Sequence, residues 1–257
     1  MKKIFFYIII TSLLWGAQSF LSGGFAHAQK TEGLIRFERQ VNWIKMMKKL
    51  PFLTQEEKDR MEQTWKNDPD PKQKMNLYFN EKESLYTWGQ DQQEYEDENW
   101  KSRNRELIFH KNFETEKRTD LIEILGKTYL VQDSLQKIDW KVMNQIKEVA
   151  GFICMKAITE DKIKGQKITA WFTGDIPVAS GPEQTFGLPG MVLELDADDG
   201  TVMVTATTVE FKKLDKELTL PKLKGKKVNN KDFDDVISKY INDSIKMQRN
   251  PYWAIRY

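Results

Sequence analysis

The sequence contains a single cysteine, Cys154, among 257 residues. One thiol cannot form an internal disulfide, and it cannot build the thiolate clusters that hold structural zinc or iron–sulfur groups. Histidine is almost as scarce, with two in the chain. His27 lies in a segment that we expect to be removed on export. The other, His110, lies in a strand-like stretch without a nucleophile motif, which favours a strand side chain at a polar surface over catalysis. We therefore predict no catalytic residue, no metal site and no cofactor.

An excess of one charge is also missing. The chain has 40 basic and 38 acidic residues. Removal of the expected export segment takes away Lys2 and Lys3, and the 38 basic residues that remain equal the acidic ones. Because nucleic-acid binding depends on a concentrated basic surface, this balance argues against nucleic acid as a partner.

Long hydrophobic runs are absent after the first residues. Met1-Lys2-Lys3 is a basic start, Ile4 to Leu14 is apolar, and Ala26-His27-Ala28 has small residues where a signal peptidase cleaves. The apolar run is about half of the roughly 20 residues that span a bilayer. We expect a signal peptide over residues 1–28, no lipidation because no cysteine follows it, and no transmembrane span after cleavage. The mature chain would be exported to the periplasm or the outer-membrane surface.

Most of the remaining sequence predicts strands. Residues 33–41 alternate apolar and polar side chains, and further strand-like segments follow across short polar turns. Such turns favour antiparallel pairing in sequence order, since parallel pairs need long crossovers. Thr54 and Glu57 form a capping-box pattern for a helix that runs to about Trp65. We predict that residues 45–75 are a helical insertion in a single domain, 29–257.

The C-terminal region predicts a second helix. It begins near Asp232, and its apolar side chains recur at helical spacing, so this face should pack on the sheet. The fold class is therefore α+β and β-rich. We expect a large curved antiparallel sheet, a half-barrel-like meander, with an inserted helix and a C-terminal helix packed on it.

The most informative segment runs from Gly151 to Leu214. Apolar residues occupy both faces of residues 152–158, which indicates a buried strand that contains Cys154 as a small buried hydrophobe. Residues 174–187 hold three glycines and two prolines and cannot form regular structure. A strand follows with Met191, Leu193 and Leu195 directed inward. Glu194 points the other way and should face solvent or pair with a cation.

Residues Gly187-Leu188-Pro189-Gly190-Met191-Val192-Leu193-Glu194 carry a family resemblance. They resemble the signature of the GLPGLI family, secreted proteins of Bacteroidetes, with Met-Val in place of Leu-Ile. The flanking 151–157, 170–173, Ile176-Pro177 and Gly181-Pro182 stand in the expected order. The resemblance covers most of the mature chain but is weak between Lys45 and Met75. It implies an envelope protein, often encoded near TonB-dependent outer-membrane receptors. That association is contextual, and no catalytic residues are carried over.

The glycines and proline of this motif have two interpretations. In the architectural one, Gly187 and Gly190 supply positive φ or close backbone approach and Pro189 stiffens the entry to the strand. In the functional one, the loop is a rim that presents side chains to a partner. The candidate binding residues are Trp171, Asp175, Phe186, Gly187, Leu188, Pro189, Gly190 and Met191.

Two functions from different classes follow. The favoured one is a noncatalytic accessory protein, secreted or periplasmic, that binds another cell-envelope component such as a TonB-dependent receptor. The alternative is a carrier that holds an apolar ligand, a lipid or lipoprotein acyl chain, in the concave face of the sheet. A carrier needs an apolar cavity, whereas an interaction protein can have a filled core and an exposed apolar patch. A hydrolase that uses carboxylates ranks third.

Overall fold

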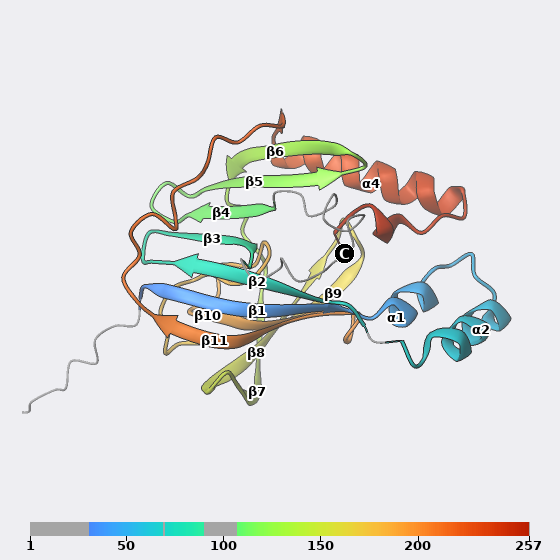
Figure 1. Cartoon of the computed structure of the whole chain (residues 1–257), viewed down its shortest axis with the longest axis horizontal. Coiled ribbons are helices and arrows are strands. Elements are labelled where there is room, and N and C mark those ends of the chain that lie inside the picture. Colours follow the sequence, from blue (N-terminus) through green and yellow to red (C-terminus); the bar gives the residue numbers. More distant parts are fainter. Residues whose placement is uncertain (1–30, 69, 90–106, 257) are drawn as a thin grey trace, which may run out of the picture.

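The computed structural model describes residues 31–68, 70–89 and 107–256. Its main element is a twelve-stranded sheet in the order β12-β6-β5-β4-β3-β2-β1-β11-β10-β9-β8-β7 (Figure 1). All neighbouring pairs are antiparallel except β12 with β6. The strands are β1 (Gly33–Val41), β2 (Lys72–Phe79), β3 (Glu83–Trp88), β4 (Ile108–Asn112), β5 (Lys117–Ile124), β6 (Lys127–Ser134), β7 (Lys141–Val149), β8 (Phe152–Asp161), β9 (Gln166–Thr173), β10 (Met191–Ala197), β11 (Val202–Phe211) and β12 (Lys226–Val228). The expected β-rich α+β class is confirmed.

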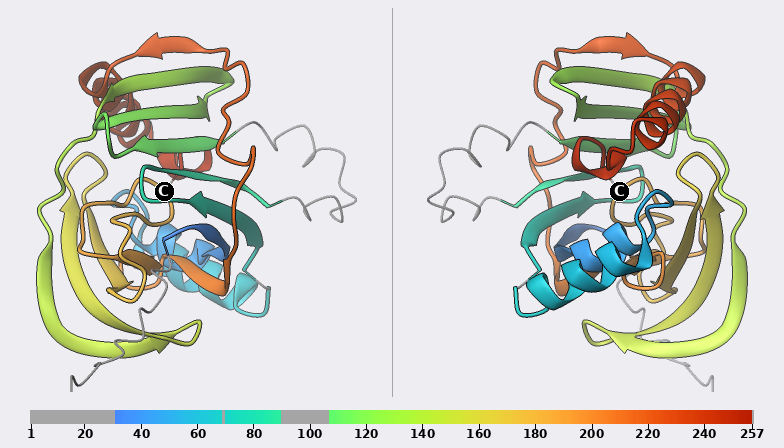
Figure 2. Two further views of the ribbon diagram at one scale, coloured as in Figure 1. Left: turned by 90° about the vertical axis from the view of Figure 1, so that its left-hand side faces the viewer. Right: turned by 90° about the vertical axis from the view of Figure 1, so that its right-hand side faces the viewer.

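The sheet consists of two meanders that meet at the β1–β11 pair, where Gly33 lies opposite Phe211. One meander runs from β1 to β6, and the other runs from β7 to β11. Residues 135–140 connect β6 to β7, near opposite ends of the sheet. Fully extended, this connection spans roughly 25 Å, whereas ten strand spacings in a flat sheet would measure roughly 48 Å. The sheet must therefore curl on itself, as Figure 2 shows.

Two of the helices occupy the positions expected from the sequence. The short helix α1 (Trp43–Lys48) and helix α2 (Gln55–Trp65) follow β1 and precede β2 in the sequence, and they project beside the sheet (Figure 1). Both hydrogen bonds of the Thr54–Glu57 capping box are present. Helix α4 (Asn230–Lys246) packs against β6, and a short 3-10 helix η2 (Pro251–Trp253) turns the tail toward the core. Among the described residues, no helix is long and apolar enough to cross a membrane.

The main core lies on the concave side of the sheet. Phe37, Tyr86 and Phe172 are among its largest fully buried side chains. The loop between β9 and β10 and the C-terminal tail also fill this side, with Ile176 and Ile255 packed into the core. A smaller cluster lies on the other face. There the strap between β11 and β12 covers four buried side chains, Leu85, Ile108, Leu121 and Leu130, with its own Leu218, Leu220 and Leu223.

Two expectations about single residues are wrong, and for Glu194 one of the two expected alternatives is found. Ile153 and Met155 of β8 are exposed, so this strand is not buried on both faces; it lies next to the last strand of the sheet, where less of the molecule covers it. His110 is buried rather than at a polar surface, and its Nε2 lies 2.7 Å from Glu83 Oε2. Glu194 is buried and does not face solvent; it pairs with Lys147, the cation partner that was the other expectation.

Candidate functional site

The Gly- and Pro-rich loop, residues 174–190, lies inside the curve of the sheet. Gly187 and Gly190 both have positive φ, 88° and 145°. A Cβ on Gly190 would lie 2.0 Å from the Thr173 carbonyl oxygen, so only glycine allows the backbone to approach β9 here. At Gly187 the space around a Cβ is open. The two glycines therefore have the geometric roles of the architectural interpretation.

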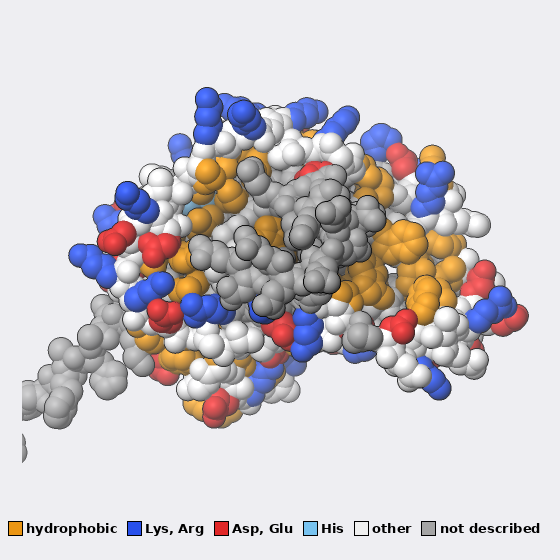
Figure 3. Space-filling view, viewed as in Figure 1, with side chains coloured by type: hydrophobic (Ala, Val, Ile, Leu, Met, Phe, Trp, Pro, Cys, Tyr) orange, Lys and Arg blue, Asp and Glu red, His pale blue; other side chains and the backbone are white. Residues whose placement is uncertain are grey.

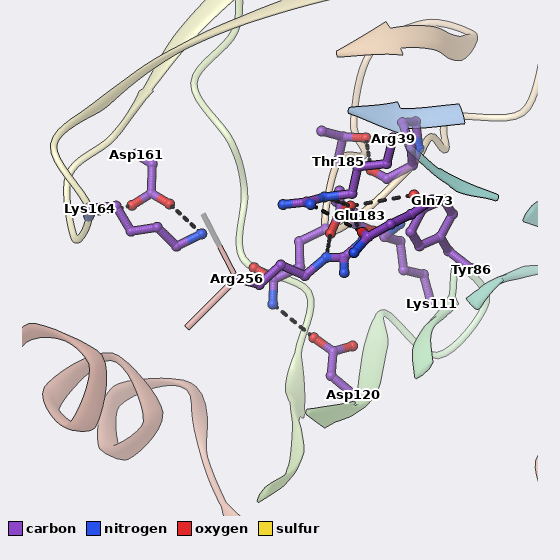
Figure 4. Close-up of polar contacts among 12 residues, drawn as sticks. Arg39, Gln73, Tyr86, Lys111, Asp120, Asp161, Lys164, Glu183, Thr185 and Arg256 are labelled. Atoms are coloured by element: carbon purple, nitrogen blue, oxygen red, sulfur yellow. Dashed lines mark hydrogen bonds and ion pairs between the residues drawn. The ribbon is translucent and has the colours of Figure 1, made fainter. Parts of the chain in front are cut away.

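A carboxylate in the middle of this loop is held by two arginines (Figure 4). Arg256 of the C-terminal tail donates two hydrogen bonds to Glu183, Nε to Oε2 at 2.5 Å and Nη2 to Oε1 at 2.6 Å. Arg39 of β1 places its Nε 3.4 Å from Glu183 Oε1, and the Tyr86 hydroxyl donates to the same oxygen at 3.4 Å. Glu183 also has a positive φ of 54°, which a non-glycine residue keeps only when its surroundings hold it.

Burial and charge act in opposite directions on this group. Burial alone would raise the pKa of Glu183, but the charges of Arg256 and Arg39 lower the pKa below its usual value. Burial lowers the pKa of Arg39 to about 10, and the nearby Arg256 adds to this effect. The bidentate pair between Glu183 and Arg256 is the geometry in which a guanidinium binds a carboxylate most strongly. It fixes the loop to the C-terminal tail.

A second buried ionic group holds the adjacent part of the loop. Lys111 Nζ donates to two loop carbonyls, Gly181 O at 3.1 Å and Glu183 O at 2.9 Å. Burial lowers the pKa of Lys111 to about 7. Asp120 accepts from Gln184 Nε2 at 3.1 Å and pairs with Arg118, while burial raises the pKa of this carboxyl group.

These residues form one cluster, which we call the ionic clamp: Arg39, Tyr86, Lys111, Arg118, Asp120, Glu183, Gln184 and Arg256. Five of them come from four different strands, two from the loop and one from the tail. Sequence analysis missed this cluster. A signal was present, because Arg39 and Lys111 follow Phe37 and Phe109 at the two-residue spacing that places side chains on one face of a strand.

The outer surface of the same loop lines a shallow hollow of about 470 Å³. Its walls are residues 137–142, which lead into β7, and residues 187–189 of the motif. We call it the Trp140 hollow, because the indole Nε1 of Trp140 donates to Phe186 O at 2.9 Å and so fixes the ring against the loop. Two lysines and one aspartate also line the hollow, together with Ile138, Leu188 and Pro189.

Apolar side chains continue from the hollow along the end of the sheet. Val142 lines the hollow, and Ile146 lies further along β7 opposite Met155 of β8. We call the exposed apolar side chains of these two strands the β7 edge patch. Its members are between 41% and 69% exposed: Val142, Ile146, Ile153 and Met155. Strand β7 is the last of the sheet, so no described strand pairs with its outer side. This side therefore combines unpaired backbone groups with exposed apolar side chains.

The eight predicted binding residues do not form one rim. Gly187, Leu188 and Pro189 line the Trp140 hollow. Phe186 contributes its carbonyl to Trp140, Gly190 packs on β9, and Met191 is fully buried. Asp175 is exposed, and its backbone N–H donates to Thr173 Oγ1 at 3.3 Å. Trp171 lies under two lysines, with the Lys147 ammonium 4.5 Å from its ring centroid.

Other candidate chemistry is limited in the described residues. Cys154 is fully buried, as expected, and burial raises the pKa of its thiol to about 11, which disfavours the reactive thiolate. Within residues 31–68, 70–89 and 107–256, no three His, Cys, Asp or Glu side chains are grouped to hold a metal ion.

Comparison with known proteins gives a family of unknown function and a fold. A family model described as "Protein of unknown function (Porph_ging)" matches residues 158–194, from β8 to the motif strand. No curated protein matches the chain. Two crystal structures of PNGF-II, in the C2 and P21 space groups, are similar to this chain with a TM-score of 0.51 and 16% sequence identity. Each match covers 81% of this chain and 33% of the PNGF-II chain, so this chain spans about one third of the length of those proteins. At this identity the likeness shows a shared fold.

Proposed function

We propose that this protein is a noncatalytic accessory protein of the cell envelope that binds another envelope component through the β7 edge patch and the adjoining Trp140 hollow. The observation that supports this proposal is the exposed apolar surface at an edge strand whose outer side pairs with no described strand. Ile146 is 69% exposed and lies opposite Met155, itself 41% exposed. Open sheet edges readily accept an additional strand, and proteins normally protect them with charge or cover.

The partner that fits this surface is an extended segment of another protein. Backbone hydrogen bonds to an edge strand give affinity, and pockets for alternate side chains give specificity. Strand β7 offers the backbone, and the Trp140 hollow offers a pocket at the point where β7 begins. Lys137, Asp139 and Lys141 on its wall supply polar contacts around the apolar floor. A register shift between Val142 and Ile146 in the β7–β8 pairing bends the edge strand beside the hollow.

The carrier function has less support. A carrier of lipid or acyl chains would need an enclosed apolar cavity in the concave face. In the described part of the chain this face is occupied by the motif loop, the tail and the ionic clamp, with Tyr86 and Ile176 fully buried. The GLPG turn, the export segment expected in residues 1–28 and the match of residues 158–194 support a secreted protein of the GLPGLI type. A TonB-dependent receptor is one envelope protein that the resemblance suggests as partner.

The test is site-specific crosslinking in the native cell. A photoreactive amino acid replaces Ile146 in one variant and Met247 in a control, because Met247 is an equally exposed apolar residue, 63% against 69%, outside the edge. We expect position 146 to crosslink to one envelope protein and position 247 to give no such product. In binding assays with that protein, Ile146→Asp should lower affinity at least tenfold, whereas Met247→Asp should not change it.

Three results would contradict the proposal. Equal crosslinking from both positions would show no preference for the edge. Crosslinks only to other copies of the chain would make the patch a self-association surface. A bound lipid without any protein partner, detected by native mass spectrometry of the protein purified from its own cells, would favour the carrier.

A further inference from the structure

The opposite end of the sheet carries lysines that have no acidic partner among the described residues. Five exposed lysines lie in strand β12, in the chain that precedes it, and at the first residue of β6: Lys127, Lys222, Lys224, Lys226 and Lys227. We call this surface the β12 lysine edge. No described residue forms an ion pair with any of them, although ten other lysines of the described chain do form such pairs. The segment 221–227 contains no acidic residue.

The pairing of β12 with β6 brings these lysines to one place. Lys226 lies opposite Tyr129 and Lys227 opposite Leu130 in the parallel ladder. Gly225 packs so closely on β6 that a Cβ would lie 3.0 Å from Thr128 O. Lys224 directly precedes Gly225 in the chain, and Lys127 directly precedes Thr128, so these two lysines flank the close contact. Figure 2 shows β12 (orange) as the outermost strand at the top of the molecule, and Figure 3 shows Lys and Arg side chains gathered along that top border.

We propose that the β12 lysine edge binds the anionic headgroups of a membrane surface. This inference is independent of the proposed contact at β7, which lies at the other end of the sheet. Unpaired lysines in a chain of nearly balanced charge concentrate positive potential at one border, and anionic lipid attracts such clusters without needing a pocket.

The chemistry of the edge favours a membrane over other anionic partners. The five cations are all lysines, mobile point charges that suit a plane of headgroups; arginine would suit bidentate recognition of a fixed phosphate. The segment 221–227 has no aromatic side chain on which the bases of a single-stranded nucleic acid would stack. Lys226 and Lys227 project from opposite faces of an edge strand, so both reach a surface that meets the sheet edge-on.

The test uses the purified exported protein and lipid vesicles. Vesicles contain either zwitterionic phosphatidylcholine alone or 30% anionic phosphatidylglycerol, and binding is measured by cosedimentation. In one variant Lys224, Lys226 and Lys227 are changed to Gln. In the matched control Lys66, Lys162 and Lys246, which are exposed lysines away from this edge, are changed to Gln.

We expect binding to the anionic vesicles only, and a decrease in binding at 0.5 M salt, where screening is strong. The edge variant should lose roughly 100-fold in partition coefficient, since each lysine near an anionic surface contributes about fivefold. The control should lose less than fivefold. Equal binding to zwitterionic vesicles, or equal losses in the two variants, would overturn the proposal. Tighter binding to a DNA duplex than to the anionic vesicles would also overturn the assignment to a membrane.

Discussion

Stability should rise with pH near neutrality because of one buried lysine. Lys111 is 2% exposed, and burial lowers its pKa from 10.5 to about 7. In the unfolded chain the amine keeps its proton up to about pH 10, whereas in the folded protein it releases the proton near pH 7. Between these values the unfolded state binds more protons. The free energy of unfolding therefore increases with pH, by up to about 1.4 kcal/mol per unit.

Integrated from pH 7.0 to 8.5, this linkage gives about 1.6 kcal/mol of added stability. The measurement should stop at pH 8.5 because of Cys154. Burial raises the pKa of this thiol from 9.0 to about 11, so above pH 8.5 the unfolded chain loses the thiol proton and the folded protein keeps it. This difference lowers the free energy of unfolding as the pH rises and would oppose the effect of Lys111. Urea unfolding at four pH values across the window measures the effect. At typical urea slopes the midpoint should rise by roughly 0.5 M or more.

The variant Lys111→Met should abolish the rise, while Lys117→Met, at an exposed lysine on the neighbouring strand β5, should retain it. A wild-type midpoint that stays flat or falls from pH 7.0 to 8.5 would refute the reasoning. So would a rise that persists in Lys111→Met. If that variant does not fold, an NMR titration of the Lys111 ε-carbon in the wild-type protein gives the same information, and a pKa near 10.5 would refute the linkage.

Three further predictions concern the motif, the clamp and the thiol. Gly190→Val should destabilise the protein by at least about 3 kcal/mol in denaturant titrations, because the new side chain would overlap the backbone of β9. Gly187→Ala, at a positive φ but in open space, should cost about 1 kcal/mol. Equal effects of the two variants would contradict the close-approach role of Gly190. Glu183→Gln should lower the free energy of unfolding by about 3–5 kcal/mol, because it leaves the buried guanidinium of Arg39 and the partly buried one of Arg256 without a carboxylate. Thermal stability equal to wild type would argue against the clamp. Cys154 should resist thiol reagents at neutral pH in the folded protein and react after unfolding, and rapid labelling of the native state would contradict its burial.

Local patterns predicted the elements of this fold well. Alternation and turn residues located most strands, and the Thr54–Glu57 capping box located the inserted helix. These signals lie within a few residues of one another, so they act before any tertiary contact forms. The short helix α1 and strand β12 were not predicted. Strand β12 has three residues, two of them lysines, and it exists because it pairs with β6, about 100 residues earlier in the chain.

The candidate site was less predictable because it depends on long-range contacts. Glu183 and Arg256 are separated by 73 residues, and no local pattern pairs them. At Gly190 the structure has both features that the architectural interpretation offered, a positive φ and a close backbone approach to β9. The expected rim of eight residues required that one side of the loop face solvent. The side that does so depends on how the ionic clamp holds the loop against the sheet, and these contacts are long-range. The β7 edge patch could not be identified without the strand order, because exposure of Ile146 follows from its place at the end of the sheet.

The central pairing of β1 with β11 has a consequence for the order of folding. These strands lie about 170 residues apart, yet together they join the two meanders. A chain that is synthesised gradually from its N-terminus presents β1 long before its partner, and closing so large a loop is slow. The first meander must wait with an open edge at β1 until β11 arrives. Arg256 lies later still in the chain, so the bidentate pair that fixes the loop between β9 and β10 can form only after both meanders have been synthesised.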